Sequence, residues 1–98
     1  RMIITSGYNV YPSHVEEILT NHKAILKCAV IGIKNESKGE IVKAFIVLRE
    51  GYNNLLTKSN IQKYMKENLA KFEIPREIRY LPTTLVGKIA YKELEKMD

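Results

Sequence analysis

The apolar positions of this chain fall into four segments with the pattern of β-strands. Residues 2–5 form a short apolar segment near the start. Residues 25–33 are β-branched and apolar on both faces after Lys27, which is typical of a central strand covered on two sides. Residues 40–49 are similar, and the short polar segment between these two predicts an antiparallel hairpin. Residues 77–81 alternate between polar and apolar side chains, which predicts a further strand.

A first helix is predicted over residues 13–22. Ser13 is followed three residues later by Glu16, which is the spacing of a capping box. We therefore expect Ser13 to begin the helix. Its apolar residues recur on one helical face: Val15, Ile18 and Leu19.

A second helix is predicted after a break at residues 51–54. Either Thr57 or Ser59 has the side chain to cap its N-terminus. Its apolar residues also share one face: Ile61, Tyr64, Met65 and Leu69. The lysines on the opposite face are expected to be a solvated surface. A short terminal helix is predicted over residues 91–97.

Residues 6–9 predict a turn, because Gly7 and Asn9 both tolerate positive φ. Taken together, the elements predict one domain of the α+β class over residues 1–98. We expect a small, mainly antiparallel sheet of about three main strands plus a short N-terminal strand, flanked by two to three helices.

The composition adds limits on compartment and partner. The single cysteine, Cys28, lies within an apolar run, which predicts a buried small side chain in a reducing compartment, and we expect the cytoplasm. No segment reaches the ~18 apolar residues that a membrane span needs, and the chain opens on an apolar segment as a fragment of something longer would. The net charge of +5 indicates an anionic partner, but the basic residues are scattered among 11 acidic ones. That scatter disfavours nucleic acid and membrane surfaces relative to a phosphorylated small molecule.

One candidate chemical group stands near the C-terminus. Pro82 ends the preceding strand, Gly87 permits a tight backbone, and Lys88 is thereby presented at a loop tip. The segment is not the phosphate loop of nucleotide hydrolases, because Pro82 stands in place of the first glycine and Ile89 in place of the Ser or Thr. A lone lysine in a loop is most often simply solvated, so its neighbours must decide its role.

The other reactive residue types form no catalytic pattern. His14 and His22 are eight residues apart and lack the cysteine or carboxylate spacing of a metal site, so we interpret both as surface or capping residues and expect no metal. Ser6 precedes Gly7, but the Gly-x-Ser-x-Gly pattern of a nucleophile elbow is missing. We do not expect this chain to contain a complete active site.

Three ordered stretches resemble the C-terminal domain of the adenylate-forming acyl-CoA synthetase superfamily, which also includes luciferases and the adenylation domains of peptide synthetases. Each stretch is a weak signal alone, and the ordered set is specific. They cover nearly the whole chain: residues 3–12 with Val15 and Glu16; Gly39 and Glu40 before an apolar strand; and Pro75, Arg76, Leu81 and Pro82 ahead of Gly87, Lys88 and Ile89.

This resemblance implies a two-step enzyme. A carboxylate, such as a fatty acid, is activated by ATP with Mg²⁺ to an acyl-adenylate, and a thiol, usually that of coenzyme A, then displaces AMP. In the superfamily the C-terminal domain closes over its own N-terminal domain in two orientations. The matching residue for adenylation is Lys88, supported by Gly87, and the residues facing the pantetheine arm are Gly7 and Tyr8. No cofactor is expected to bind the 98 residues alone.

Three positions depart from the superfamily pattern. His14, Val86 and Tyr91 stand where members commonly carry Glu, Ser or Thr, and Arg. None of the three departures falls at Lys88 or Gly7, the positions that match the superfamily's functional residues. The departures therefore concern individual contacts and not the resemblance as a whole.

Other functions stay open at this point. In a peptide-synthetase adenylation domain, the acceptor thiol belongs to a carrier protein. The net charge of +5 and six tyrosines suggest a small basic binding module, perhaps for RNA, although the tyrosines are not interleaved with arginines on one predicted strand. A free-standing C-terminal domain that acts in trans or as a scaffold is a further alternative.

Overall fold

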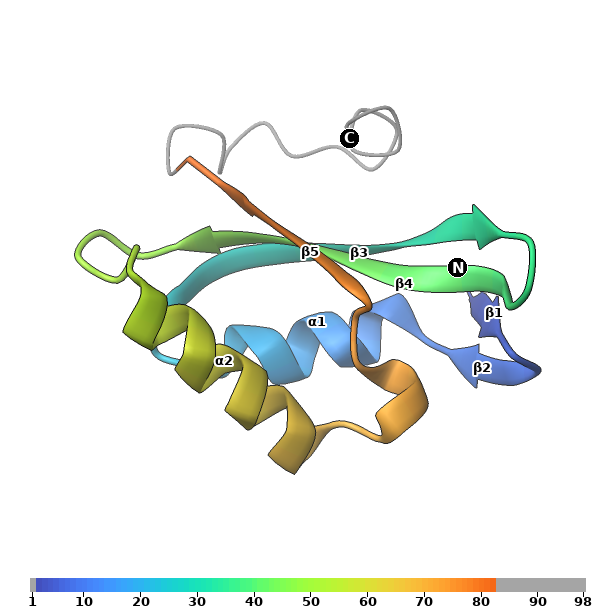
Figure 1. Cartoon of the computed structure of the whole chain (residues 1–98). Coiled ribbons are helices and arrows are strands. Elements are labelled where there is room, and N and C mark those ends of the chain that lie inside the picture. Colours follow the sequence, from blue (N-terminus) through green and yellow to red (C-terminus); the bar gives the residue numbers. More distant parts are fainter. Residues whose placement is uncertain (1, 83–98) are drawn as a thin grey trace.

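Strand β4 (Gly39–Leu48) is the centre of a five-stranded sheet in the computed structural model, which describes residues 2–82 (Figure 1). Along one edge it pairs with β3 (Ile25–Asn35), and along the other with β1 (Ile3–Thr5) and β5 (Glu77–Leu81). Every residue from 41 to 48 is buried. The rest of the described chain is assembled around this strand.

Strands β3 and β4 form the predicted antiparallel hairpin. Their pairing extends from Ile25 to Asn35 of β3. The Asn35 side chain closes the turn, because its Oδ1 accepts hydrogen bonds from the backbone nitrogens of Ser37 and Lys38 at 3.1 and 3.0 Å. A local side-chain bond of this kind is how asparagine stabilises turns.

The predicted central position of residues 25–33 is wrong. Among the described strands, β3 pairs only with β4. A side chain of helix α1 (Pro12–Thr20) reaches its outer edge instead: a carboxylate oxygen of Glu16 accepts a hydrogen bond from the Val30 backbone nitrogen at 2.8 Å. An apolar run shows that both faces of a strand are buried, and it carries no information about the strand's edges.

Strand β5 runs parallel to β4. Their pairing begins with Lys43 opposite Glu77 and ends with Val47 opposite Leu81. The chain between them contains helix α2 (Leu55–Asn68) and the short 3₁₀ helix η1 (Lys71–Glu73). Adjacent parallel strands need a crossover of this kind, whereas antiparallel neighbours do not. The strand predicted at residues 77–81 is confirmed, and the sheet is mainly antiparallel because its other pairings are antiparallel.

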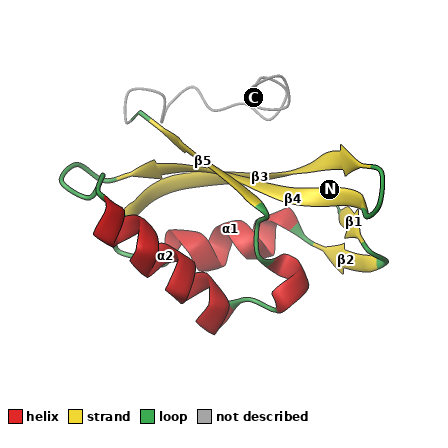
Figure 2. Cartoon of the chain, viewed as in Figure 1, coloured by secondary structure: helices red, strands yellow, loops and turns green. Residues whose placement is uncertain are grey.

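Both α-helices lie on one face of the sheet (Figure 2). Their apolar residues and the strand residues that face them form the main core: Ile3, Val10, Val15, Leu19, Val30, Val42, Ala44, Ile46, Ile61, Met65 and Leu69. The alternate residues of the strands form a second cluster: Ala29, Ile31, Phe45, Val47 and Leu81. This arrangement confirms the α+β class with a mainly antiparallel sheet.

Helix α1 begins without the predicted capping box. Its N-cap is Tyr11, which makes no side-chain cap bond, and Pro12 occupies the start of the helix, where its missing N–H leaves no hydrogen bond unmade. Glu16 turns its carboxylate to the edge of β3 and not to the helix start. The helix ends at Thr20, short of the predicted His22.

Helix α2 is capped by Asn54 and not by Thr57 or Ser59. It begins at Leu55, and Asn54 Oδ1 accepts a hydrogen bond from the Thr57 backbone nitrogen at 2.8 Å. The predicted apolar stripe is confirmed, with three members in the core: Ile61, Met65 and Leu69.

The terminal helix predicted at residues 91–97 lies outside the described residues. Within residues 2–82, no helix has the length and apolar character that crossing a membrane requires.

We expect Asn54→Ala to lower the free energy of unfolding by about 1 kcal/mol, because the N–H of Thr57 loses its acceptor. Urea denaturation followed by circular dichroism measures this change. Ser59→Ala is the matched control: Ser59 is exposed inside α2, and its replacement should change the stability by less than about 0.5 kcal/mol. Equal effects of the two substitutions would contradict the assigned cap.

Candidate functional site

The two short strands at the start of the chain form a hairpin with a tight turn. Strand β2 (Tyr8–Val10) pairs antiparallel with β1, and Ser6 and Gly7 connect them with φ values of +50° and +83°. Two successive positive φ angles match the right-handed twist of the flanking strands, which favours such turns in two-residue hairpins. The prediction that Gly7 forms a turn is confirmed. The prediction that Asn9 belongs to the turn is wrong, because Asn9 lies in β2 and pairs with Ile4 of β1.

The turn lies beside the loop between β3 and β4. The Ser6 backbone nitrogen donates to the Lys38 carbonyl oxygen at 2.8 Å, and Thr5 is paired with Gly39. A Cβ atom added at Gly7 would have no heavy atom within 4 Å. The Gly7 backbone is therefore open to any molecule that approaches the turn.

Tyr8 packs on η1 through an aromatic stack. Its ring centroid lies 4.6 Å from that of Phe72, with an interplanar angle of 16°. The two side chains stay partly exposed, at 55% for Tyr8 and 36% for Phe72. The stack thus joins the hairpin to a segment more than 60 residues later in the chain and leaves ring surface in contact with solvent.

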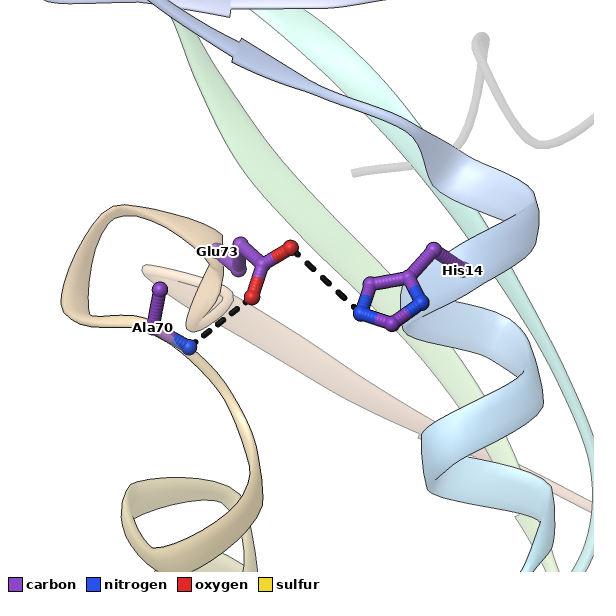
Figure 3. Close-up of polar contacts among 3 residues, drawn as sticks. All are labelled: His14, Ala70 and Glu73. Carbon is purple, nitrogen blue, oxygen red and sulfur yellow. Dashed lines mark hydrogen bonds and ion pairs between the residues drawn. The ribbon is translucent and has the colours of Figure 1, made fainter.

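Glu73 fixes the position of η1 (Figure 3). One carboxylate oxygen accepts a hydrogen bond from the Ala70 backbone nitrogen at 2.8 Å, and the other lies 3.6 Å from His14 Nε2 on α1. The contact with His14 is an ion pair only when the imidazole is protonated. His14 is therefore a surface residue, as predicted, that also links α1 to η1.

A groove of about 930 Å³ lies between the hairpin and η1. Its apolar part is contributed by Val42, Leu69 and Ile74, and Tyr8 and Phe72 form one wall. Among the described residues its lining includes no carboxylate, and it includes four cationic side chains: Lys38, Lys66, Lys71 and Arg76. Cations grouped around a concave surface raise the local concentration of anions. The groove can therefore hold a ligand that combines anionic groups with a flat or apolar part.

The sequence-predicted site residues are only partly placed. Tyr8 lines the groove, and Gly7 lies beside it in the turn between two lining residues, Ser6 and Tyr8. Gly87 and Lys88 lie outside the described residues. The groove itself was not predicted, because its cations come from two separate stretches of the chain, Lys38 in one and residues 66–76 in the other. Pro75 and Arg76, already part of the motif set, are the signal that pointed nearest to it.

The other reactive residues that the structure describes do not form a catalytic group. Burial raises the pKa of the Cys28 thiol to about 12, so this side chain is a neutral core residue, as predicted. His22 Nδ1 accepts a hydrogen bond from the Ala24 backbone nitrogen at 3.1 Å, and burial together with Lys23 lowers the pKa of His22. Within residues 2–82, no three His, Cys, Asp or Glu side chains are grouped to share a metal ion.

Comparison with known proteins gives a consistent result. A model of the family described as the AMP-binding enzyme C-terminal domain matches residues 14–88. The chain is 43% identical over 101 residues to an acetyl-coenzyme A synthetase of Bacillus subtilis, covering 99% of this chain and 18% of that protein. It is 38% identical over 96 residues to a long-chain-fatty-acid–CoA ligase of Yersinia pestis, covering 95% of this chain and 16% of that protein.

The fold agrees with solved structures. Against the o-succinylbenzoate CoA synthetase of Bacillus subtilis in complex with its acyl-adenylate intermediate, the TM-score is 0.78 with 29% identity, over 99% of this chain and 20% of that one. The chain spans a fifth or less of the length of each of these relatives.

The stack between Tyr8 and Phe72 should be energetically measurable. A double-mutant cycle of Tyr8→Ala and Phe72→Ala should give a coupling of about 0.5–1.5 kcal/mol in the free energy of unfolding, because stacked rings interact beyond their buried area. The matched control is the cycle of Tyr11→Ala with Phe72→Ala. Tyr11 is also 55% exposed, and among the ring contacts of the described residues it has none with Phe72. Equal coupling in both cycles would contradict the stack.

Proposed function

Because the chain belongs to the family of AMP-binding enzyme C-terminal domains, we propose that it is the C-terminal domain of an AMP-forming acyl-CoA synthetase. It acts with an N-terminal domain that carries most of the pockets for ATP and the carboxylic acid, which is a fatty acid or a related carboxylate. The acceptor is coenzyme A. The enzyme works in the cytoplasm, where the buried free thiol of Cys28 stays reduced.

The proposed reaction has two balanced steps. A carboxylate oxygen attacks the α-phosphorus of ATP, and pyrophosphate leaves, giving the acyl-adenylate. The sulfur of coenzyme A then attacks the acyl carbon, the bond to AMP breaks, and the thiol proton is released. Mg²⁺ would accompany ATP and neutralise phosphate charge.

Lys88 is the residue we assign to the first step. An anionic carboxylate must approach an anionic phosphate, and negative charge grows on the non-bridging oxygens, so a cation delivered there lowers the barrier. A lysine suits this role because its ammonium is a compact charge on a flexible stem. Gly87 leaves the backbone free enough for Lys88 to reach a ligand held mainly by another domain.

The groove at the hairpin carries the assignment of the second step. Coenzyme A combines a thin pantetheine arm with a phosphorylated nucleotide. The open backbone at Gly7 suits the arm, while the ring surface of Tyr8 and Phe72 and the surrounding cations suit the flat base and the phosphates. The single observation that supports this proposal best is the placement of these cations beside the Gly7 turn.

Lys88→Ala in the complete enzyme should lower carboxylate-dependent ATP–pyrophosphate exchange by at least about a hundredfold, because the transition state loses a fixed charge. Thioester formation from preformed acyl-adenylate should largely survive. Lys92→Ala, a lysine four residues further on with no assigned role, is the control. Unchanged exchange in Lys88→Ala would remove Lys88 from the mechanism.

Gly7→Leu should show the reverse pattern, with exchange preserved and thioester formation reduced by about tenfold or more, because a bulky side chain would enter the path of the pantetheine arm. The matched control is Gly51→Leu. Gly51 has φ +88°, close to the +83° of Gly7, and a Cβ there also has nothing within 4 Å. The two substitutions impose the same kind of backbone strain at different places. If Gly51→Leu impaired thioester formation equally, strain and not position would be the cause.

A further inference from the structure

The backbone contact between the first strand and β4 is short, and a side chain extends it. Strand β1 shares a single registered pair with β4, between Thr5 and Gly39. One residue earlier, the backbone nitrogen of Ile4 donates its hydrogen bond to Glu40 Oε1 at 3.0 Å, and not to the main chain of β4. The Glu40 carboxylate therefore extends the contact between the two strands beyond the point where their backbones separate.

Gly32 of β3 makes room for this carboxylate. A Cβ atom at position 32 would lie 2.6 Å from Glu40 Oε2 and 3.0 Å from Ile3 Cγ1, and real Cβ atoms do not approach heavy atoms as closely as the first of these distances. Gly32 is not among the residues with positive φ, so its backbone conformation does not require glycine. The absence of a side chain is instead what allows Glu40 and Ile3 to rest on the strand.

We propose that Glu40 is a positioning residue for the Gly7 turn, and this rests on the proposed function of that turn. Its carboxylate holds the Ile4 nitrogen, two residues before Ser6, and so sets the angle at which the hairpin leaves the sheet. The backbone contacts beside the turn are short: Ser6 donates to Lys38, and Thr5 pairs with Gly39. Without Glu40, β1 would keep these contacts and its buried Ile3, but the hairpin that carries the Gly7 turn would be held less firmly against β4.

The chemistry of the bond favours a carboxylate. A charged acceptor makes a stronger bond to a backbone N–H than a neutral one. Glutamine keeps an oxygen at the same reach and is therefore expected to preserve a weaker bond, whereas alanine removes the acceptor. Gly32→Ala disturbs the same contact from the opposite side, because its Cβ would displace the Glu40 carboxylate.

The test uses the complete enzyme with Glu40→Ala, Glu40→Gln, Gly32→Ala and the control Glu36→Ala, which changes an exposed glutamate in the neighbouring turn. Hydrogen–deuterium exchange of the β1 amides is measured together with the two half-reactions. We expect exchange at Ile4 to become roughly ten- to a hundredfold faster in Glu40→Ala, which is the range for losing a hydrogen bond to a charged group. The KM for coenzyme A should rise by about tenfold, while ATP–pyrophosphate exchange is unchanged.

Two further results are expected and separate positioning from simple stability. Gly32→Ala should resemble Glu40→Ala. Glu40→Gln, which keeps a neutral acceptor, should give amide exchange and KM between those of Glu40→Ala and the parent enzyme. Thermal unfolding of Glu40→Gln and Glu36→Ala serves as a check that the domain is folded.

Several outcomes would overturn the proposal. Unchanged exchange at Ile4 in Glu40→Ala would show that the bond does not hold the strand. An equal fall in the rates of both half-reactions in Glu40→Ala would show that Glu40 has a general structural role. Faster exchange at Ile4 with an unchanged KM, in an enzyme where Gly7→Leu does impair thioester formation, would show that Glu40 does not position the turn for catalysis. If Gly7→Leu has no effect, the proposed function of the hairpin fails, and amide exchange at Ile4 still decides whether Glu40 holds β1.

Discussion

The structure depends on the burial of β4. Residues 41–48 are all buried, and three strands pair with it along its two edges. A strand enclosed in this way cannot shift by one residue without moving each apolar side chain to the opposite layer. Lys43 is its only charged residue within that span, and its Nζ lies 3.8 Å from Glu77 Oε1 and 5.0 Å from the centroid of the Phe45 ring. The ion partner is the residue that pairs with Lys43 on β5, so charge and backbone pairing specify the same register.

This enclosure also places the hairpin and β5 along one edge of β4. Strands β1 and β5 lie on the same edge of β4, so the hairpin with Gly7 and the strand that leads toward Lys88 are parts of one surface. Arg76 of the groove directly precedes β5, and Pro82 directly follows it. At about 3.3 Å per residue, the five residues of β5 separate the groove from the start of the Lys88 segment by roughly 16 Å.

The parts of the fold that could be predicted are those where side-chain type and burial are directly linked. The apolar runs of β3 and β4, the alternation in β5 and the stripe of α2 all follow from that link. The helix caps were misassigned, because several residues near each helix start have suitable side chains and only the folded chain shows which are free. The Glu16 carboxylate, for example, accepts a hydrogen bond from the Val30 backbone nitrogen on β3.

By itself, the sequence determined the α+β class, the β3–β4 hairpin, the buried state of Cys28 and the need for glycine at position 7, since each follows from local side-chain chemistry or backbone sterics. Only the tertiary structure decided that β4 and not β3 is central, and that Tyr8 stacks on Phe72. It alone brought Lys38 and the cations of residues 66–76 to one groove. These contacts join residues far apart in the chain, and no local pattern of side chains encodes which distant segments meet.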